Sequence, residues 1–140
     1  FPGSCGYKIL NSSDNYKLKI VSYKLDGNKK INNFLDKNFK KFKTVNEDLE
    51  VFKIKTKSEL KRQITSKNSS GEALTHKLEI IINLDVFKND ELIDNTTFRK
   101  NTNYNNLNSK FELKQYENIL IQDLTKQIIF QINLHLNSIK

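Results

Sequence analysis

Cysteine and proline are nearly absent from this chain of 140 residues, which holds one of each. The single cysteine, Cys5, excludes a disulfide framework and a metal cluster of cysteines. Because the only proline is Pro2, turns inside the chain must be recognised from clusters of Gly, Asn, Asp and Ser. The four glycines are scattered and form no phosphate-binding loop, which argues against a nucleotide site of that kind.

A long apolar run is also missing. The longest apolar region, residues 78–87, is broken by Glu79, Asn83 and Asp85. A membrane-spanning helix needs roughly 18 or more apolar residues, so any attachment to a membrane must come from something other than a span.

The length suits one domain, and the apolar fraction of 36% is low for a globular chain without being that of a disordered one.

Arginine is scarce, although the net charge is +8 at pH 7. The chain has 22 Lys against 2 Arg, together with 19 Asn and 15 Ile. An AT-rich genome encodes such a profile, whereas charge selected for phosphate or base recognition tends to use Arg. The excess charge is therefore open to two interpretations, a solvated surface and a site for an anionic partner.

Hydrophobic periodicity predicts four strands and two helices. The alternation of a half-buried strand occurs over residues 16–25, 49–66, 73–87 and 92–104. A helical period occurs over residues 31–45 and again after Ser109, where Glu112 completes a capping box. Polar segments that read as turns separate these elements at 26–28, 67–71 and 88–91.

This order predicts an α+β fold with the element order β-α-β-β-β-α. The simplest architecture is a four-stranded mixed sheet, mostly antiparallel, with two helices packed on one face. Residues 16–140 would form this single domain, and residues 1–15 an N-terminal tail. Beyond residue 128 apolar residues appear around most of the last helix, so that end is either deeply buried or covered by a partner.

No group of residues in the sequence suggests catalysis or metal binding. His76 lies in the apolar register of the strand over 73–87, where a packed or hydrogen-bonded histidine is expected. His135 lies near the end of the last helix, where the helix dipole favours a cation. The two histidines have no close Cys or His partner, and the acidic residues are scattered. We therefore expect a protein that is not an enzyme, with no catalytic residue, no metal site and no cofactor.

The segment 37–43 interleaves lysines with aromatic residues and has two interpretations. In a nucleic-acid surface, aromatic side chains would stack on bases while lysines contact phosphates. In the other interpretation, Phe39 and Phe42 belong to the core and the lysines face water. The helical phase favours the core, because both phenylalanines fall on the apolar side.

The N-terminus carries a candidate lipidation site at Cys5. The segment Ser4-Cys5-Gly6-Tyr7 resembles the end of a bacterial lipoprotein signal peptide, in which a small residue precedes the cysteine that is lipidated. Several acyl chains on one residue give stable anchoring to a membrane. Three residues before the cysteine, such signal peptides usually have an aliphatic residue, whereas this chain has Pro2. Residues 1–4 could also be a remnant that is not native. The other interpretation is a free thiol on a tail.

Several segments together resemble the LptE family of outer-membrane lipoproteins. Cys5-Gly6-Tyr7 is similar to the Cys-Gly-aromatic start of the mature proteins. Residues 71–78 resemble the central hairpin of the family, residues 98–108 its segment before the last helix, and residues 124–136 its C-terminal helix. The likeness covers nearly the whole chain from Cys5 in order and spacing. Its weight lies in the ensemble, because no single motif is specific.

The resemblance implies two helices on a four-stranded sheet, which agrees with the fold inferred from periodicity. It also implies an outer-membrane lipoprotein that sits inside an LptD β-barrel as plug and assembly aid and that binds lipopolysaccharide. Family members contact the glycolipid through basic residues near the hairpin tip and the start of the last helix. The matching positions are Lys67, Lys110 and Lys114. Cys5 would anchor the protein to the periplasmic face of the outer membrane.

Two further classes stay open. One is another periplasmic accessory lipoprotein, such as a secretin pilotin or a transport accessory domain. The other is a basic nucleic-acid-binding α+β module, whereas the leading interpretation has no nucleic-acid partner.

Overall fold

The described part of the chain forms four strands and two helices in the order predicted from its sequence. The computed structural model describes residues 16–44 and 48–139. In chain order the elements are β1 (Lys19–Gly27), α2 (Lys29–Lys43), β2 (Val51–Lys67), β3 (Ala73–Lys88), β4 (Glu91–Asn105) and α3 (Lys110–Ser138). The expected α+β fold, with a mixed four-stranded sheet and two helices, is confirmed.

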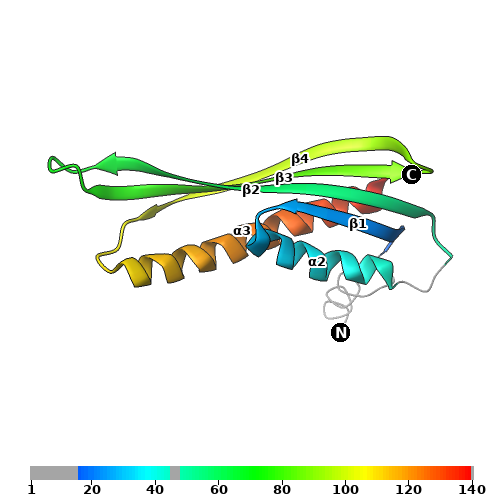
Figure 1. The fold of residues 1–140 in the computed structure, drawn as a ribbon, viewed down its shortest axis with the longest axis horizontal. Helices are drawn as coiled ribbons and strands as arrows, with labels where there is room; N and C mark the ends of the chain where they lie inside the picture. The colour runs from blue at the N-terminus through cyan, green and yellow to red at the C-terminus, as the bar shows by residue number, and fades with distance from the viewer. Residues whose placement is uncertain (1–15, 45–47, 140) are drawn as a thin grey trace, which may run out of the picture.

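The four strands form one sheet in the order β1-β2-β3-β4. β1 runs parallel to β2, and α2 makes the crossover that a parallel pair requires. β2, β3 and β4 form an antiparallel meander with short turns. Both helices lie against the same face of the sheet, so the opposite face is open (Figure 1).

The core lies between the helices and the face that they cover. Alternate residues of the central strands point into it, among them Ile54 of β2 and Ile80 of β3, which are almost fully buried. α2 contributes Phe39 and Phe42, both completely buried. For the segment 37–43, the interpretation that its aromatic residues belong to the core is therefore confirmed.

α3 is buried along only part of its circumference. Its buried apolar residues are Leu113, Ile121, Leu124, Ile128, Ile132 and Leu136. Phe130 and Leu134, in the half where apolar residues surround the helix, are 60% and 57% exposed. The sequence predicted that this end is either deeply buried or covered by a partner, and deep burial is wrong for these two side chains. Neither helix of the described residues is apolar over enough of its length to cross a membrane.

The molecule is elongated, and its two ends differ (Figure 1). At one end, here named the tip end, the β2–β3 hairpin projects with its tip at residues 68–72, above the start of α3. The other end, the turn end, holds the β3–β4 turn at residues 89–90 and the starts of β1 and β2. The helices do not reach under the hairpin tip. Leu74 was expected on the apolar face with Leu78, and it is 47% exposed because this part of the face is uncovered.

Side-chain caps begin both helices. At the start of α2, Asn28 Oδ1 accepts a hydrogen bond from the N–H of Ile31 at 3.1 Å. At the start of α3, Ser109 Oγ accepts one from the N–H of Glu112 at 3.2 Å. Each cap satisfies an N–H group that has no partner within the helix. The position of the Ser109 cap agrees with the prediction from the sequence.

Candidate functional site

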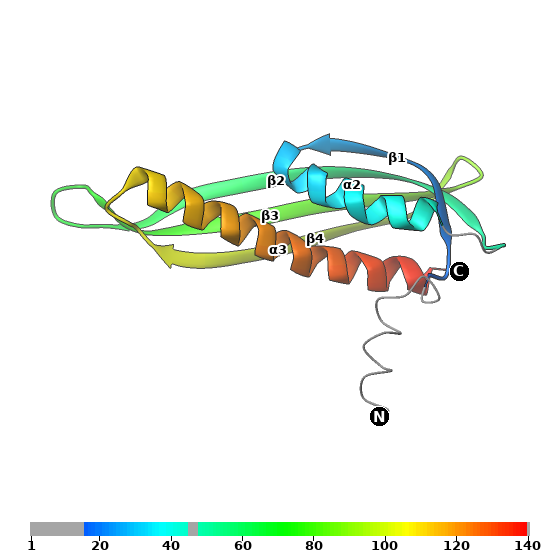
Figure 2. The ribbon, with the colours of Figure 1, turned by 90° about the horizontal axis from the view of Figure 1, so that it is seen from below.

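The three lysines implied by the family resemblance lie at the tip end. Lys67 is the last residue of β2, Lys110 is the first residue of α3, and Lys114 follows one turn later. All three are exposed. α3 begins at the same end from which the hairpin projects (Figure 2), so basic residues that are far apart in the sequence lie toward one end of the molecule. The candidate lipidation site, Cys5, lies outside the described residues.

The tip beside Lys67 is ordered by Asn68. The side-chain oxygen of Asn68 accepts hydrogen bonds from the N–H groups of Ser70 and Glu72, each at 2.9 Å. The N–H of Asn68 donates to the carbonyl of Glu72, also at 2.9 Å. Such local bonds replace the strand ladder where the chain reverses. Lys67 is therefore presented at the base of a turn that has its own hydrogen bonds.

Exposed apolar side chains accompany the lysines. Ile64 and Leu74, on the helix side of the hairpin, are 49% and 47% exposed. Phe111, which follows Lys110, is 69% exposed. A surface that combines ammonium groups with exposed apolar side chains suits a ligand that has both anionic and apolar parts.

Behind this surface, a buried polar network fixes α3 to the sheet. Glu117 of α3 is 8% exposed, and its Oε2 accepts hydrogen bonds from Arg62 Nε at 2.7 Å and from the Tyr104 hydroxyl. The ring of Tyr104 stacks on His76, with 5.3 Å between the ring centroids. His76 Nε2 in turn lies 3.0 Å from Asn106 Oδ1. The carboxylate of Glu117 thus joins β2 and β4 to the first part of α3.

The environment of Tyr104 keeps its hydroxyl protonated. Burial of the phenol, followed by its hydrogen bond to Glu117, raises the pKa of Tyr104 from 10.0 to about 12. Sequence reasoning missed the network because its members are distant along the chain. The available signal was a carboxylate, Glu117, placed four residues after Leu113 and four before Ile121 on the apolar side of α3.

Both histidines contact residues of β4. His76 is 4% exposed and packed, as its register predicted. His135 Nε2 lies 2.7 Å from Asp94 Oδ2 and 3.1 Å from Thr96 Oγ1. A catalytic triad uses one ring nitrogen for the hydroxyl and the other for the carboxylate, whereas both contacts here use the same nitrogen. Within residues 16–44 and 48–139, no three His, Cys, Asp or Glu side chains are grouped to bind a metal ion.

No protein-family model matches the chain, and no curated protein resembles it in sequence. Solved structures do resemble it. Rare lipoprotein B from Shewanella oneidensis matches 84% of this chain and 94% of its own, with a TM-score of 0.64 and 12% identity.

Two further bacterial lipoproteins match over similar lengths. Lipoprotein B from Nitrosomonas europaea covers 82% of this chain and 81% of its own, with a TM-score of 0.59 and 16% identity. A minor lipoprotein from Acinetobacter baumannii covers 84% of this chain and 94% of its own, with a TM-score of 0.51 and 16% identity. At these identities the likeness shows a shared fold.

Proposed function

We propose that this protein is a lipid-anchored lipoprotein of the outer membrane, which occupies an LptD-like β-barrel and contacts lipopolysaccharide through Lys67, Lys110 and Lys114. The observation that carries the proposal is that these lysines all lie toward the tip end, where exposed apolar side chains also lie. Lipopolysaccharide has phosphates and acyl chains, which match the two kinds of group. The fold shared with bacterial lipoproteins supports the same class.

The barrel partner is supported by the shape and polarity of the molecule. The lumen of an outer-membrane barrel is polar, so a protein inside it needs a largely polar surface. The net charge is +8, and lysine and asparagine are the most frequent residues on the open face of the sheet. The proposed role is structural and ligand-binding, without catalysis, and it includes no nucleic-acid partner.

The anchor is proposed to be Cys5, on the periplasmic face of the outer membrane. Expression of the precursor in cells fed labelled palmitate, followed by mass spectrometry of the mature N-terminus, measures acylation. We expect acylated Cys5 at the first position of the mature chain. Cys5→Ser should remove the label and release the protein from the membrane fraction. An unmodified Cys5 in the mature protein would remove the anchor from the proposal.

The barrel is tested by co-expression of the precursor with the LptD protein of the same organism, followed by purification in detergent. We expect recovery of the two chains in a one-to-one complex. If the barrel folds and Cys5 is acylated but the two proteins separate, the assignment to barrel assembly is wrong and another periplasmic accessory role takes its place.

The lipopolysaccharide contact is tested with the double variant Lys67→Glu/Lys110→Glu. Two reversed charges at the tip end should weaken lipopolysaccharide binding by at least about tenfold, because each lysine near an anionic surface contributes about 1 kcal/mol. The matched control is Lys37→Glu/Lys41→Glu, two exposed lysines of α2. Equal binding by the tip variant and the control, with both folded by circular dichroism, would contradict the assignment of these residues.

A further inference from the structure

A second cationic surface lies on the open face of the sheet at the turn end. Residues paired across neighbouring strands lie on the same face. One row across the sheet consists of Ser22, Lys53, Phe87 and Leu92, and the next consists of Lys24, Lys55, Asp85 and Asn95. Tyr23 and Ile54, between the two rows, point toward the helices. The side chains of both rows therefore face away from the core.

The charges in these rows are poorly balanced. Lys24 and Lys55 are direct partners in the parallel pair, and like charges placed opposite each other are unfavourable. Among the ion pairs of the described residues, neither of these two lysines takes part. The carboxylate opposite Lys55, that of Asp85, accepts a hydrogen bond from the Asn95 amide instead.

The remaining charges of the surface leave it cationic. The ammonium of Lys55 lies over the ring of Phe87, 5.4 Å from its centroid. Lys53 pairs with Asp90 at 3.3 Å, but the Asp90 side chain is 85% exposed, so water screens the attraction. The surface thus has three ammonium groups against two carboxylates, those of Asp85 and Asp90, which leaves a net positive charge of one.

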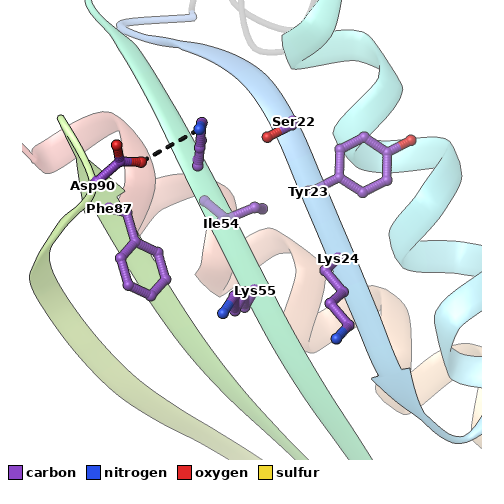
Figure 3. Close-up of a pocket in the computed structure, with 8 residues that line it drawn as sticks. Ser22, Tyr23, Lys24, Ile54, Lys55, Phe87 and Asp90 are labelled. Carbon is purple, nitrogen blue, oxygen red and sulfur yellow. Dashed lines mark hydrogen bonds and ion pairs between the residues drawn. The ribbon is translucent and has the colours of Figure 1, made fainter.

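These side chains enclose a groove of about 380 Å³ that runs over β2 (Figure 3). Lys24 and Ser22 of β1 line one side, and Phe87 and Asp90 line the other. Two apolar residues that neighbour its lining residues are exposed. Val51, two residues before Lys53 on the same face, and Leu92, the partner of Phe87, are each 51% exposed. Cationic and apolar groups meet here, as they do at the interface of a membrane.

We propose that this groove binds the phosphate of an anionic phospholipid headgroup, with Lys24, Lys53 and Lys55 around the phosphate and Val51 and Leu92 toward the acyl chains. Charge complementarity favours a phosphate over a neutral ligand. The exposed apolar side chains favour a lipid over a free ion. The site lies at the opposite end of the molecule from Lys67, Lys110 and Lys114.

The length of the N-terminal segment also favours a bilayer, and this single argument rests on the proposed lipid anchor. β1 begins at the turn end, 14 residues after Cys5. A chain of that length spans at most about 50 Å. An acylated Cys5 would therefore keep the start of β1 within about 50 Å of the membrane surface.

The proposal is tested with the unacylated chain and vesicles, which separates it from the anchor, the barrel and lipopolysaccharide. We expect flotation with phosphatidylglycerol vesicles and little with phosphatidylcholine vesicles. Lys24→Gln/Lys55→Gln should weaken binding by about twenty-five-fold, since each lysine near an anionic surface contributes about a factor of five. The control Lys37→Gln/Lys41→Gln removes the same charge from α2 and should retain most of the affinity.

A second pair of variants tests the apolar contribution. Val51→Ser/Leu92→Ser should weaken vesicle binding severalfold, whereas Phe130→Ser/Leu134→Ser, two exposed residues of α3, should not. Equal losses in the Lys24/Lys55 and Lys37/Lys41 variants would overturn the proposal, because binding would then follow net charge alone. Displacement of the protein from vesicles by millimolar glycerol phosphate would also overturn the lipid assignment, in favour of a site for free phosphate esters.

Discussion

The carboxylate of Glu117 is almost completely buried. A buried carboxylate is costly unless it is paired and hydrogen-bonded. Here Arg62 supplies the opposite charge, and Tyr104 supplies a second donor to the same oxygen. The Arg62 side chain is 51% exposed while that of Glu117 is 11% exposed, so the cation remains partly hydrated. The pair therefore serves mainly to fix where α3 sits on the sheet.

Glu117→Ala should destabilise the fold. The change leaves the buried Tyr104 hydroxyl without its acceptor, which costs about 1–3 kcal/mol. The midpoint of urea unfolding, followed by circular dichroism, measures this. Gln115→Ala, an exposed position two residues earlier on α3, is the control and should change the midpoint little. Equal midpoints for the two variants would show that the network does not stabilise the protein.

Alkaline pH should weaken the fold through Tyr104 and Tyr23. The pKa of each phenol is raised from 10.0 to about 12, first by burial and then by a hydrogen bond to a carboxylate, Glu117 or Asp36. In the unfolded chain these phenols lose their protons near pH 10, while in the folded protein they keep them. The stability they contribute is therefore complete below pH 10 and is lost as the pH rises toward 12.

Unfolding measured between pH 9 and pH 12, with tyrosinate absorbance in parallel, tests this expectation. This range includes both the ordinary pKa of tyrosine, 10.0, and the raised pKa of Tyr104, about 12. Tyr104→Phe should flatten the fall in stability over that range. Tyr116→Phe, at a tyrosine that is 40% exposed, is the control and should leave the slope unchanged. A slope that is the same in wild type and Tyr104→Phe would contradict the role given to burial.

At the scale of the elements, the turn from β1 into α2 depends on Gly27. Its backbone φ of +105° lies in a region that residues other than glycine rarely adopt. An added Cβ would also lie 2.0 Å from the carbonyl oxygen of Ser58. Gly27→Ala should therefore cost about 3 kcal/mol or more, since strained φ alone costs about 1–3 kcal/mol. Gly71→Ala is the control, because its φ is +85° but its Cβ would meet open space. The difference in thermal midpoint between the two variants measures the clash, and equal losses would rule it out.

The elements themselves follow closely from the sequence. The strand predicted at 73–87 is β3 (Ala73–Lys88), and the helix predicted at 31–45 is α2 (Lys29–Lys43). Alternation over a dozen residues has no competing helical interpretation, and Ser109 marks the start of the last helix by its capping chemistry. Asn28 was predicted only as part of a turn, and the structure shows that it caps α2. The prediction began the first strand at Tyr16, whereas β1 begins at Lys19.

The tertiary contacts did not follow from the sequence in the same way. The family resemblance gave Lys67 at the hairpin tip and Lys110 at the start of the last helix as candidate glycolipid contacts, and in the structure both segments lie toward the tip end. Their contact with lipopolysaccharide stays a prediction. The Glu117 network and the groove at Lys24 and Lys55 depend on which residues pair across strands. A pattern of period two fixes the face of each residue but leaves its cross-strand neighbour undetermined.

At the scale of the whole molecule, the sheet is longer than the layer of helices that stabilises it. Toward the tip, residues 61–67 of β2 have no fully buried apolar side chain, whereas residues 78–86 of β3 include five: Leu78, Ile80, Ile82, Leu84 and Val86. Stability varies along a structure with the apolar contacts that each part makes. The tip end should therefore open locally without unfolding the rest.

Amide hydrogen exchange followed by NMR tests this gradient. We expect the amides of residues 63–67 and 73–75 to exchange at least about tenfold faster than those of residues 80–86, because their hydrogen bonds lack a packed apolar layer. The two sets share the same ladder between β2 and β3, so each serves as the control for the other. Uniform protection along the ladder would mean that the hairpin and the core open together.

The exposed tip also lies midway in the order of elements, with two strands and one helix before it and two strands and one helix after it. A single tryptic cut after Lys67 would produce one fragment with β1, α2 and β2, and a second with β3, β4 and α3. Protruding tips are the preferred sites of such nicking. Hydrogen bonds between β2 and β3 would join the two fragments, and each fragment would supply part of the same core. They should therefore stay associated after the cut. The fold is thus a natural candidate for fragment complementation, in which two separately expressed pieces reassemble only when both are present.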